Sequence, residues 1–146
     1  MIKPLLISFC LVAPAQAAAQ RHASLVPPGW TQEYQDAATR TRRFVSPDNR
    51  SSLTSRQIEA SRTDLARVLQ RMEAEDEITY QRQEGSWFVV SGYRGNQIFY
   101  RKANLACHGT RWNIIELVYP RENKRQMDAT VAFISHGMTA YRDDCA

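Results

Sequence analysis

The chain has 146 residues, of which 43% are hydrophobic, and a formal net charge of +4. This length suits one domain with a single core rather than two domains. The mild positive charge is not the clustered basic patch that binding to a nucleic-acid backbone requires, although it is compatible with weak attraction to anionic polymers of the cell envelope.

Residues 1–19 have the pattern of a secretory signal peptide. A single lysine precedes a short apolar run, and small residues follow at Ala15, Ala17 and Ala19. The apolar run is much shorter than the roughly 20 residues that span a bilayer, so no retained membrane span is expected. Cleavage after Ala17 and cleavage after Ala19 both fit the pattern, and the sequence does not decide between them.

The exported chain retains two cysteines, because Cys10 is removed with the signal peptide. An oxidising compartment favours a disulfide between Cys107 and Cys145. Closing the loop between them would add about 4 kcal/mol to the free energy of unfolding in the chain-entropy model. The bond would also tie the C-terminal tail to the sheet.

Residues 20–28 are expected to form an exposed lead-in, because they include Pro27-Pro28 and show no periodicity. One domain then covers residues 29–146. Its first predicted element is a hairpin within Arg40–Thr54. The turn of this hairpin is Ser46-Pro47-Asp48-Asn49, in which proline, aspartate and asparagine occupy their favoured positions.

Helical periodicity predicts the next element, a helix over residues 62–75, in which one face carries Leu65, Val68, Leu69 and Met72. Four strands are predicted after this helix, over residues 78–82, 87–93, 97–104 and 111–119. The second and fourth of these strands carry apolar residues on both faces, which predicts that the sheet is covered on both sides.

Glycines in the central hairpin suggest two local features. Gly95-Asn96 is typical of a tight two-residue turn. Gly92 is expected to relieve crowding against a neighbouring helix.

A second helix is predicted after Pro120, with Met127, Val131, Ile134 and Met138 on one face and Gly137 as a terminating position. Strands joined by such short connections pair antiparallel. The predicted fold class is therefore α+β, a single domain with a mainly antiparallel sheet flanked by helices.

The segment from Ile78 to Met138 resembles uncharacterised exported proteins of Alphaproteobacteria, through the stretches WFVVSGYRGNQIFYRK, ELVYP and MDATVAFIS. The fold of those proteins is similar to the α/β/α sandwich of PsbP-like and DcrB-like proteins. The resemblance implies this sandwich, and GW followed by FVSPDN resembles its opening hairpin. It implies no catalytic residue, and a fold by itself does not identify a function.

The stretch SGYRGN, residues 91–96, has glycines beside Arg94, as some phosphate-binding loops do. Such loops lead from a strand into the N-terminus of a helix. Here the residues that follow are predicted to form a strand. We therefore interpret the stretch as a hairpin turn.

Catalytic and metal sites find little support in the sequence. Cys107 adjoins His108, but a disulfide would remove the thiolate that thiol catalysis needs, and the G-x-S-x-G motif of serine hydrolases is absent. Potential zinc ligands lack the usual spacing: Cys107, His108, His136, Asp143 and Asp144. His22 falls in the lead-in and has no assigned role. We expect no catalytic residue, metal or cofactor.

Aromatic side chains could line a ligand pocket, although core packing explains most of them: Trp30, Trp87, Trp112, Phe88, Phe99, Tyr93, Tyr100 and Tyr119. Cationic residues accompany two tyrosines of the central hairpin. Together they form a predicted partner surface: Tyr93, Arg94, Tyr100, Arg101 and Lys102.

The sequence thus predicts a periplasmic or secreted, non-catalytic binding or accessory domain. Its partner would be an envelope protein or an anionic envelope polymer, and not a nucleic acid. Two alternatives stay open. One is an envelope enzyme, such as a hydrolase, with a site that sequence does not reveal. The other is an accessory domain that inhibits or helps to assemble another envelope protein.

Overall fold

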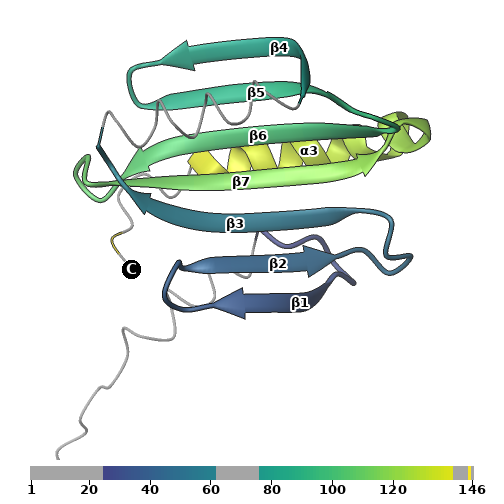
Figure 1. Cartoon of the computed structure of the whole chain (residues 1–146), viewed down its shortest axis with the longest axis horizontal. Coiled ribbons are helices and arrows are strands. Elements are labelled where there is room, and N and C mark those ends of the chain that lie inside the picture. Colours follow the sequence, from purple (N-terminus) through teal and green to yellow (C-terminus); the bar gives the residue numbers. More distant parts are fainter. Residues whose placement is uncertain (1–24, 62–75, 140–144, 146) are drawn as a thin grey trace, which may run out of the picture.

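Seven strands form one sheet in the order β1-β2-β3-β7-β6-β5-β4 (Figure 1). The computed structural model describes residues 25–61, 76–139 and 145. Every neighbouring pair of strands is antiparallel, as predicted. The elements are β1 (Thr31–Asp36), β2 (Thr41–Val45), β3 (Ser52–Glu59), β4 (Glu77–Glu84), β5 (Trp87–Arg94), β6 (Gln97–Ala106), β7 (Arg111–Pro120), the 3-10 helix η1 (Arg121–Asn123) and α3 (Lys124–Thr139).

The pairing of β3 with β7 joins the two halves of the sheet. β1, β2 and β3 neighbour one another in chain order, and so do β4 to β7. At the junction, Leu53 lies opposite Leu117 and Ile58 lies opposite Trp112. At this junction β3 and β7, which are far apart in the sequence, become neighbours in the sheet.

The predicted β2–β3 turn is confirmed, and side chains as well as backbone hold it. The Ser46 Oγ donates to Asp48 Oδ1 at 2.6 Å and accepts from the Ser51 amide at 3.0 Å. Asn49 takes a φ of +57°, which asparagine tolerates better than most residues. Local turn chemistry was thus sufficient to predict this connection.

The β5–β6 turn is also confirmed as a two-residue connection. Arg94 pairs with Gln97, which leaves Gly95 and Asn96 as the central residues. Gly95 takes a φ of +57°, whereas Asn96 does not have a positive φ. Glycine at the first central position fits a type II′ turn. The turn leads into β6, so the phosphate-loop alternative lacks the helix it would need.

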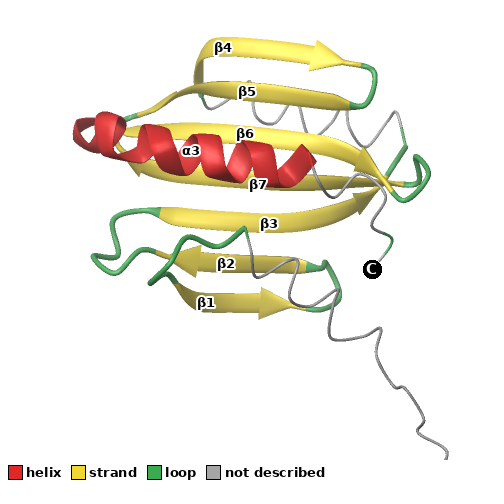
Figure 2. Ribbon diagram, turned by 180° about the vertical axis from the view of Figure 1, so that it is seen from behind, coloured by secondary structure: helices red, strands yellow, loops and turns green. Residues whose placement is uncertain are grey.

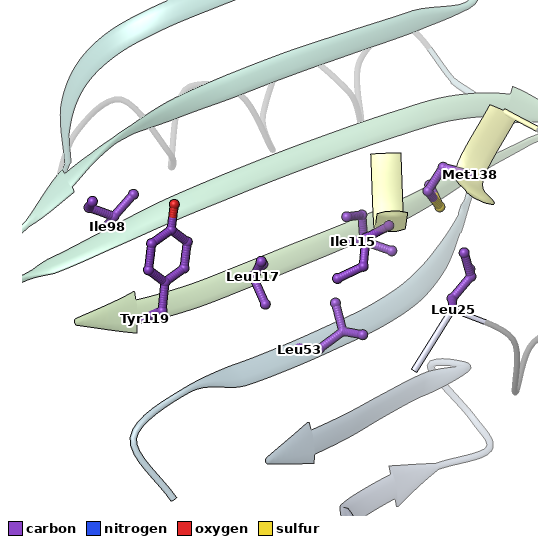
Figure 3. Close-up of a cluster of buried hydrophobic side chains, with 8 residues drawn as sticks. Leu25, Leu53, Ile98, Ile115, Leu117, Tyr119 and Met138 are labelled. Atoms are coloured by element: carbon purple, nitrogen blue, oxygen red, sulfur yellow. The ribbon is translucent and has the colours of Figure 1, made fainter. Parts of the chain in front are cut away.

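Apolar residues are buried on both faces of the central strands, as the patterns of β5 and β7 predicted. On one face, α3 lies along β6 and β7 (Figure 2). It covers a first cluster, shown in Figure 3: Leu25, Leu53, Ile98, Ile115, Leu117, Tyr119, Ile134 and Met138. The opposite face carries a second cluster: Phe88, Val90, Phe99, Ala103, Trp112, Ile114 and Val118.

The predicted apolar face of α3 is confirmed, because Ile134 and Met138 are buried while Met127 and Val131 pack against the same cluster. The prediction that Gly137 ends the helix is wrong, since α3 continues to Thr139. A Cβ at position 137 would lie only 2.4 Å from Leu25 Cδ2. Gly137 therefore makes room for a core side chain.

The exposed lead-in is wrong for its described part. Leu25 is 6% exposed and belongs to the first cluster, and Pro27 is also buried. Apolar side chains of this segment cover the sheet beside α3. The polar residues that surround them in the sequence do not indicate this burial. Residues 20–24 lie outside the described residues.

Gly92 does relieve crowding, but against a strand and not against a helix. A Cβ at Gly92 would lie 2.0 Å from the carbonyl oxygen of Glu77 in β4. The β4–β5 register shifts between Ile78 and Tyr80, close to this contact. The glycine therefore permits the close approach of the two backbones.

The predicted helix over residues 62–75 lies outside the described residues. Helical cover is consequently shown for one face of the sheet, by α3, and the flanking of both faces is confirmed only in part. Neither η1 nor α3, the helices of the described residues, is long and apolar enough to cross a membrane.

Candidate functional site

The predicted partner surface of the central hairpin is not one exposed strip. Arg94 and Arg101 lie on the face opposite α3, where their guanidinium carbons are 5.7 and 4.5 Å from the centre of the Phe99 ring. Tyr93 and Tyr100 pack against the first cluster, on the α3 face. Neighbouring residues of a strand point to opposite faces, so these side chains cannot act together.

Two of the predicted surface residues are buried, which corrects the prediction. Arg101 is 5% exposed and Lys102 is 9% exposed, because β6 lies inside the sheet. The Lys102 ammonium donates to the carbonyl oxygen and the Oγ of Ser135, at 2.8 and 3.0 Å. Burial raises the pKa of Tyr100, the neighbour of these residues. Lys102 thus fastens α3 to β6.

The arginines of the hairpin are held in a network with Asp76 and Glu116. Arg94 donates to Asp76 through Nε at 2.8 Å and Nη2 at 3.1 Å. Arg101 donates to Asp76 Oδ2 at 2.8 Å and also pairs with Glu116. Burial opposes ionisation of Asp76, but the two arginines outweigh it and hold the pKa of Asp76 below its usual value. These arginines serve the fold.

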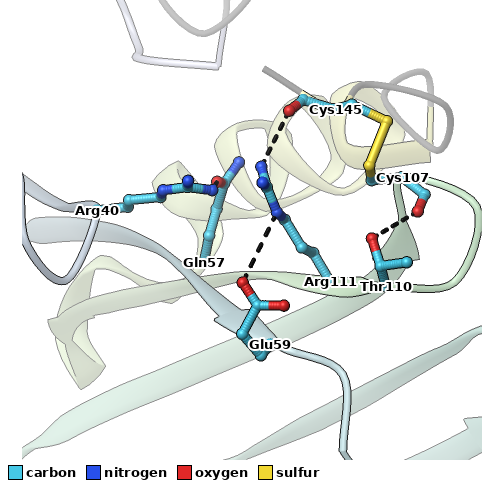
Figure 4. Close-up of a disulfide and its surroundings, with 7 residues drawn as sticks. All are labelled: Arg40, Gln57, Glu59, Cys107, Thr110, Arg111 and Cys145. Atoms are coloured by element: carbon cyan, nitrogen blue, oxygen red, sulfur yellow. Dashed lines mark hydrogen bonds and ion pairs between the residues drawn. A yellow bond between two sulfur atoms is a disulfide. The ribbon is translucent and has the colours of Figure 1, made fainter.

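The disulfide between Cys107 and Cys145 is present, with Cα atoms 4.5 Å apart (Figure 4). A bonded sulfur has no thiolate to act as a nucleophile. Cys107 and His108 both take positive φ, 50° and 54°, in the turn before β7. The predicted tie between tail and sheet is reinforced by Arg111, whose Nη1 donates to the carbonyl oxygen of Cys145 at 2.9 Å.

The residues considered as zinc ligands are not brought together in the described part of the chain. His108 is exposed in its turn, and His136 is exposed in the last turn of α3. Across residues 25–61, 76–139 and 145, no three histidine, cysteine, aspartate or glutamate side chains cluster as metal ligands. Asp143 and Asp144 lie outside these residues.

Most of the aromatic residues pack in the core: Phe88, Phe99, Trp112 and Tyr119 are buried, and Trp30, Tyr93 and Tyr100 are partly buried against the first cluster. Trp87 lies under Arg82, whose guanidinium carbon is 5.4 Å from the ring centre. Three tyrosines line a hollow of about 210 Å³ beside α3: Tyr93, Tyr100 and Tyr119. This volume is below the roughly 300–1,000 Å³ of ordinary ligand sites.

A larger cavity, of about 380 Å³, lies over β1, β2 and β3 on the α3 face of the sheet. α3 runs along β6 and β7 and does not extend over β1 and β2 (Figure 2). The apolar part of the cavity lining, which we call the floor, consists of Leu25, Val26, Phe44, Leu53 and Ile115. Polar residues on its other side, which we call the rim, include Gln35, Arg40, Arg42, Ser55 and Gln57.

Arg42 holds the central position of the rim. It lies opposite Gln35 of β1 and opposite Ser55 of β3, so the three side chains share one face of the sheet. Within the described part of the chain, Arg42 makes no ion pair. Arg43, the next residue, lies on the other face with Tyr34 and pairs with Glu33 at 2.9 Å. Arg42 is therefore a cation that the described residues leave available.

Arg40 lines the same cavity from the turn between β1 and β2. Its Nη1 donates to Gln57 Oε1 at 3.2 Å (Figure 4). Arg40 takes a φ of +50°, which is uncommon for a residue other than glycine. The turn between β1 and β2 therefore sets the direction of this side chain across the cavity.

Sequence reasoning missed this cavity. The alternation of Arg42 and Phe44 with Arg43 and Val45 is visible in the sequence. However, arginine occurs on both faces of β2, so the pattern does not reveal which face borders the core. The signal becomes interpretable only when Leu25 is known to be buried beside the same strand.

No family model and no curated protein matches the sequence. Among solved structures, the solution structure of cyanobacterial PsbP (CyanoP) from Synechocystis sp. PCC 6803 matches with a TM-score of 0.54, covering 77% of this chain and 82% of that chain at 12% identity. The chain has a PsbP-like fold.

The match supports the PsbP-like fold that the resemblance over Ile78–Met138 implied, whereas the α/β/α sandwich is shown only in part, because α3 covers one face of the sheet. An identity of 12% shows the fold alone. The function of this PsbP-like chain must therefore be argued from its own residues.

Proposed function

We propose that the chain is an exported, non-catalytic binding or accessory domain of the cell envelope, and that it binds its partner through the cavity over β1–β3. The observation that carries the proposal is the combination of an apolar floor with Arg42, a rim cation that makes no ion pair in the described part of the chain. Ligand sites commonly combine apolar walls with a few polar groups.

Location in the envelope is supported by two independent features. Residues 1–19 have the order of a signal peptide, and Cys107 bonded to Cys145 fits a compartment in which disulfides persist. The partner that we propose is an envelope protein or an anionic envelope component. An accessory role, such as inhibiting or assembling another envelope protein, would use the same cavity.

Photo-cross-linking tests this proposal with a matched pair of positions. A benzophenone-bearing amino acid would be placed either at Gln35, which lines the cavity, or at Tyr34, which is 51% exposed on the opposite face. The full-length chain is expressed in a bacterial host, and adducts are sought in the periplasmic fraction. We expect adducts from position 35 in clear excess over position 34.

Three outcomes would contradict the proposal. Equal adduct yields at the two positions would reject the cavity as the binding site, and retention of the chain in the cytosol would reject export. Hydrolysis of an envelope substrate by the purified chain, abolished by Arg42→Gln, would replace the proposal with the enzyme alternative.

A further inference from the structure

Resting on the proposed function, we infer that the cavity over β1–β3 binds a single-chain amphiphile with an anionic head group. Its apolar chain lies on the floor, and its carboxylate or phosphate faces Arg42. The inference rests on the composition of the floor, the charge of the rim and the hydrogen bonds that Asp36, the acid beside the rim, already accepts.

The floor favours an apolar ligand of limited size. Five apolar side chains from the lead-in, β2, β3 and β7 converge on it: Leu25, Val26, Phe44, Leu53 and Ile115. Three of them, Leu25, Leu53 and Ile115, are already buried. The apolar surface that a ligand can still cover therefore comes mainly from the half-buried Val26 and Phe44. Removing that surface from water favours an acyl chain over a polar molecule. The volume of about 380 Å³ is near the lower end of ordinary ligand sites, which fits one chain better than a bulky lipid.

The rim is positively charged. Arg40 and Arg42 line the cavity, and Asp36 is the one acid among its described lining residues. The Asp36 carboxylate accepts from the Ala38 amide at 2.9 Å and from Thr39 Oγ at 2.8 Å, so it is occupied within its own turn. Asp36 therefore leaves the charge of Arg42 without a nearby ion pair.

The geometry around Arg42 suits an oxyanion. A guanidinium presents paired N–H donors that match the oxygens of a carboxylate or phosphate. Gln35 and Ser55 lie directly opposite Arg42 on the two neighbouring strands and can donate further hydrogen bonds on the same face. Phe44 and Leu53 form the next pair along these strands on the same face, and the apolar floor begins with them. Head group and chain thus have adjoining places.

Titration calorimetry on the oxidised, exported chain tests the inference with four probes: dodecanoate, dodecyl phosphate, the uncharged dodecanol and acetate. We expect both anionic amphiphiles to bind with one molecule per chain. The affinity for dodecanol should be at least about tenfold lower, because dodecanol lacks the charge-assisted hydrogen bonds. Acetate should not bind measurably. The ratio of dodecanoate to dodecyl phosphate affinity distinguishes a fatty-acid ligand from a phosphate-headed lipid.

Adjacent arginines supply the variant and its control. Arg42→Gln should weaken dodecanoate binding about tenfold while leaving dodecanol binding unchanged. Arg43→Gln, on the other face of β2, should leave both affinities unchanged. If Arg42→Gln fails to fold, amide chemical shifts of the wild type replace it: dodecanoate should shift Gln35 and Ser55 and leave Arg43 unaffected.

Several results would overturn the inference. They are equal affinity for dodecanoate and dodecanol, equal losses in the two arginine variants, measurable binding of acetate alone, and no binding of any amphiphile. The proposed function survives each of these results if a protein adduct forms specifically at position 35. Conversely, amphiphile binding without export would leave the inference standing and reject the proposed envelope role.

Discussion

Asp76 shows how single residues of this protein combine burial with charge. Its side chain is 1% exposed, yet it accepts hydrogen bonds from two arginines that come from neighbouring strands, β5 and β6. An unpaired carboxylate in such a position would be strongly unfavourable. Arg94 and Arg101 are therefore engaged in ion pairs with Asp76 and Glu116, which is why cationic residues in the central hairpin were a misleading sign of a partner surface.

Replacing this carboxylate should be costly. Asp76→Asn removes the carboxylate that both guanidinium groups contact, and we expect the free energy of unfolding to fall by about 3 kcal/mol. Urea denaturation at neutral pH measures the change. Glu84→Gln, in the exposed pair with Arg82, is the matched control and should cost less than about 1 kcal/mol. Equal losses would show that the network stabilises no more than a surface pair.

The same variant makes a pH-dependent prediction. The pKa of Asp76 is lowered from its ordinary value of 3.8 by folding, so its contribution to stability is present above that value and is lost as pH falls through the lower folded value. The difference in free energy of unfolding between wild type and Asp76→Asn should therefore shrink on acidification below about pH 4. A difference that stays constant down to about pH 2 would contradict this assignment.

At the scale of elements, the β4–β5 hairpin depends on a glycine in an interior position. Gly92→Ala would place a Cβ 2.0 Å from the Glu77 carbonyl oxygen and 2.9 Å from Ile78 Cα. Backbone atoms can move only by opening the ladder, so we expect a loss near the upper end of about 1–3 kcal/mol, with faster amide exchange in β4. Gly85→Ala, in the same hairpin, meets no atom within 4 Å and should change stability by less than about 0.5 kcal/mol.

Elements whose signals are local were predicted correctly. The spacing of Met127, Val131, Ile134 and Met138 specifies one helical face whatever the helix packs against, and the Ser46–Asn49 turn carries its own hydrogen bonds. Strand pairing followed from the short connections. Local patterns therefore accounted for the strand count after the first predicted helix, for the antiparallel pairing and for the face of α3.

Burial at the site was not predictable in the same way. Arg101 is buried because β6 has neighbours on both sides and because Asp76, distant in sequence, compensates its charge. The cavity arises where Leu25 and Ile115, far apart in the chain, meet the polar hairpin around Arg42. Both features depend on tertiary neighbours, which no periodicity in a single segment encodes.

At the scale of the whole molecule, a disulfide links the turn before β7 to Cys145. Cys107 and Cys145 are 38 residues apart, and Cys145 also accepts a hydrogen bond from Arg111 at the start of β7. The bond holds Cys145 at the turn that precedes β7 (Figure 4). Its loss should therefore affect the stability of the domain.

Removing the disulfide should lower the free energy of unfolding by up to about 4 kcal/mol, since the unfolded chain regains the freedom of the closed loop. Cys145→Ser can be compared with the wild type under reducing conditions, and the two should have the same unfolding midpoint in urea. An unfolded, unreduced sample should show no free thiol in the exported chain. Two reactive thiols would mean that the bond does not form in the compartment where the protein resides.

The pairing of β3 with β7 also orders events in time. While the chain is being made or threaded through a membrane, Leu53 has no cross-strand neighbour on that side until Leu117 has emerged. One edge of β3 therefore stays unpaired until nearly the whole chain is available. Pairing across such a sequence separation is intrinsically slow. Under the export that we propose, β3 would pair with β7 only when translocation is almost complete.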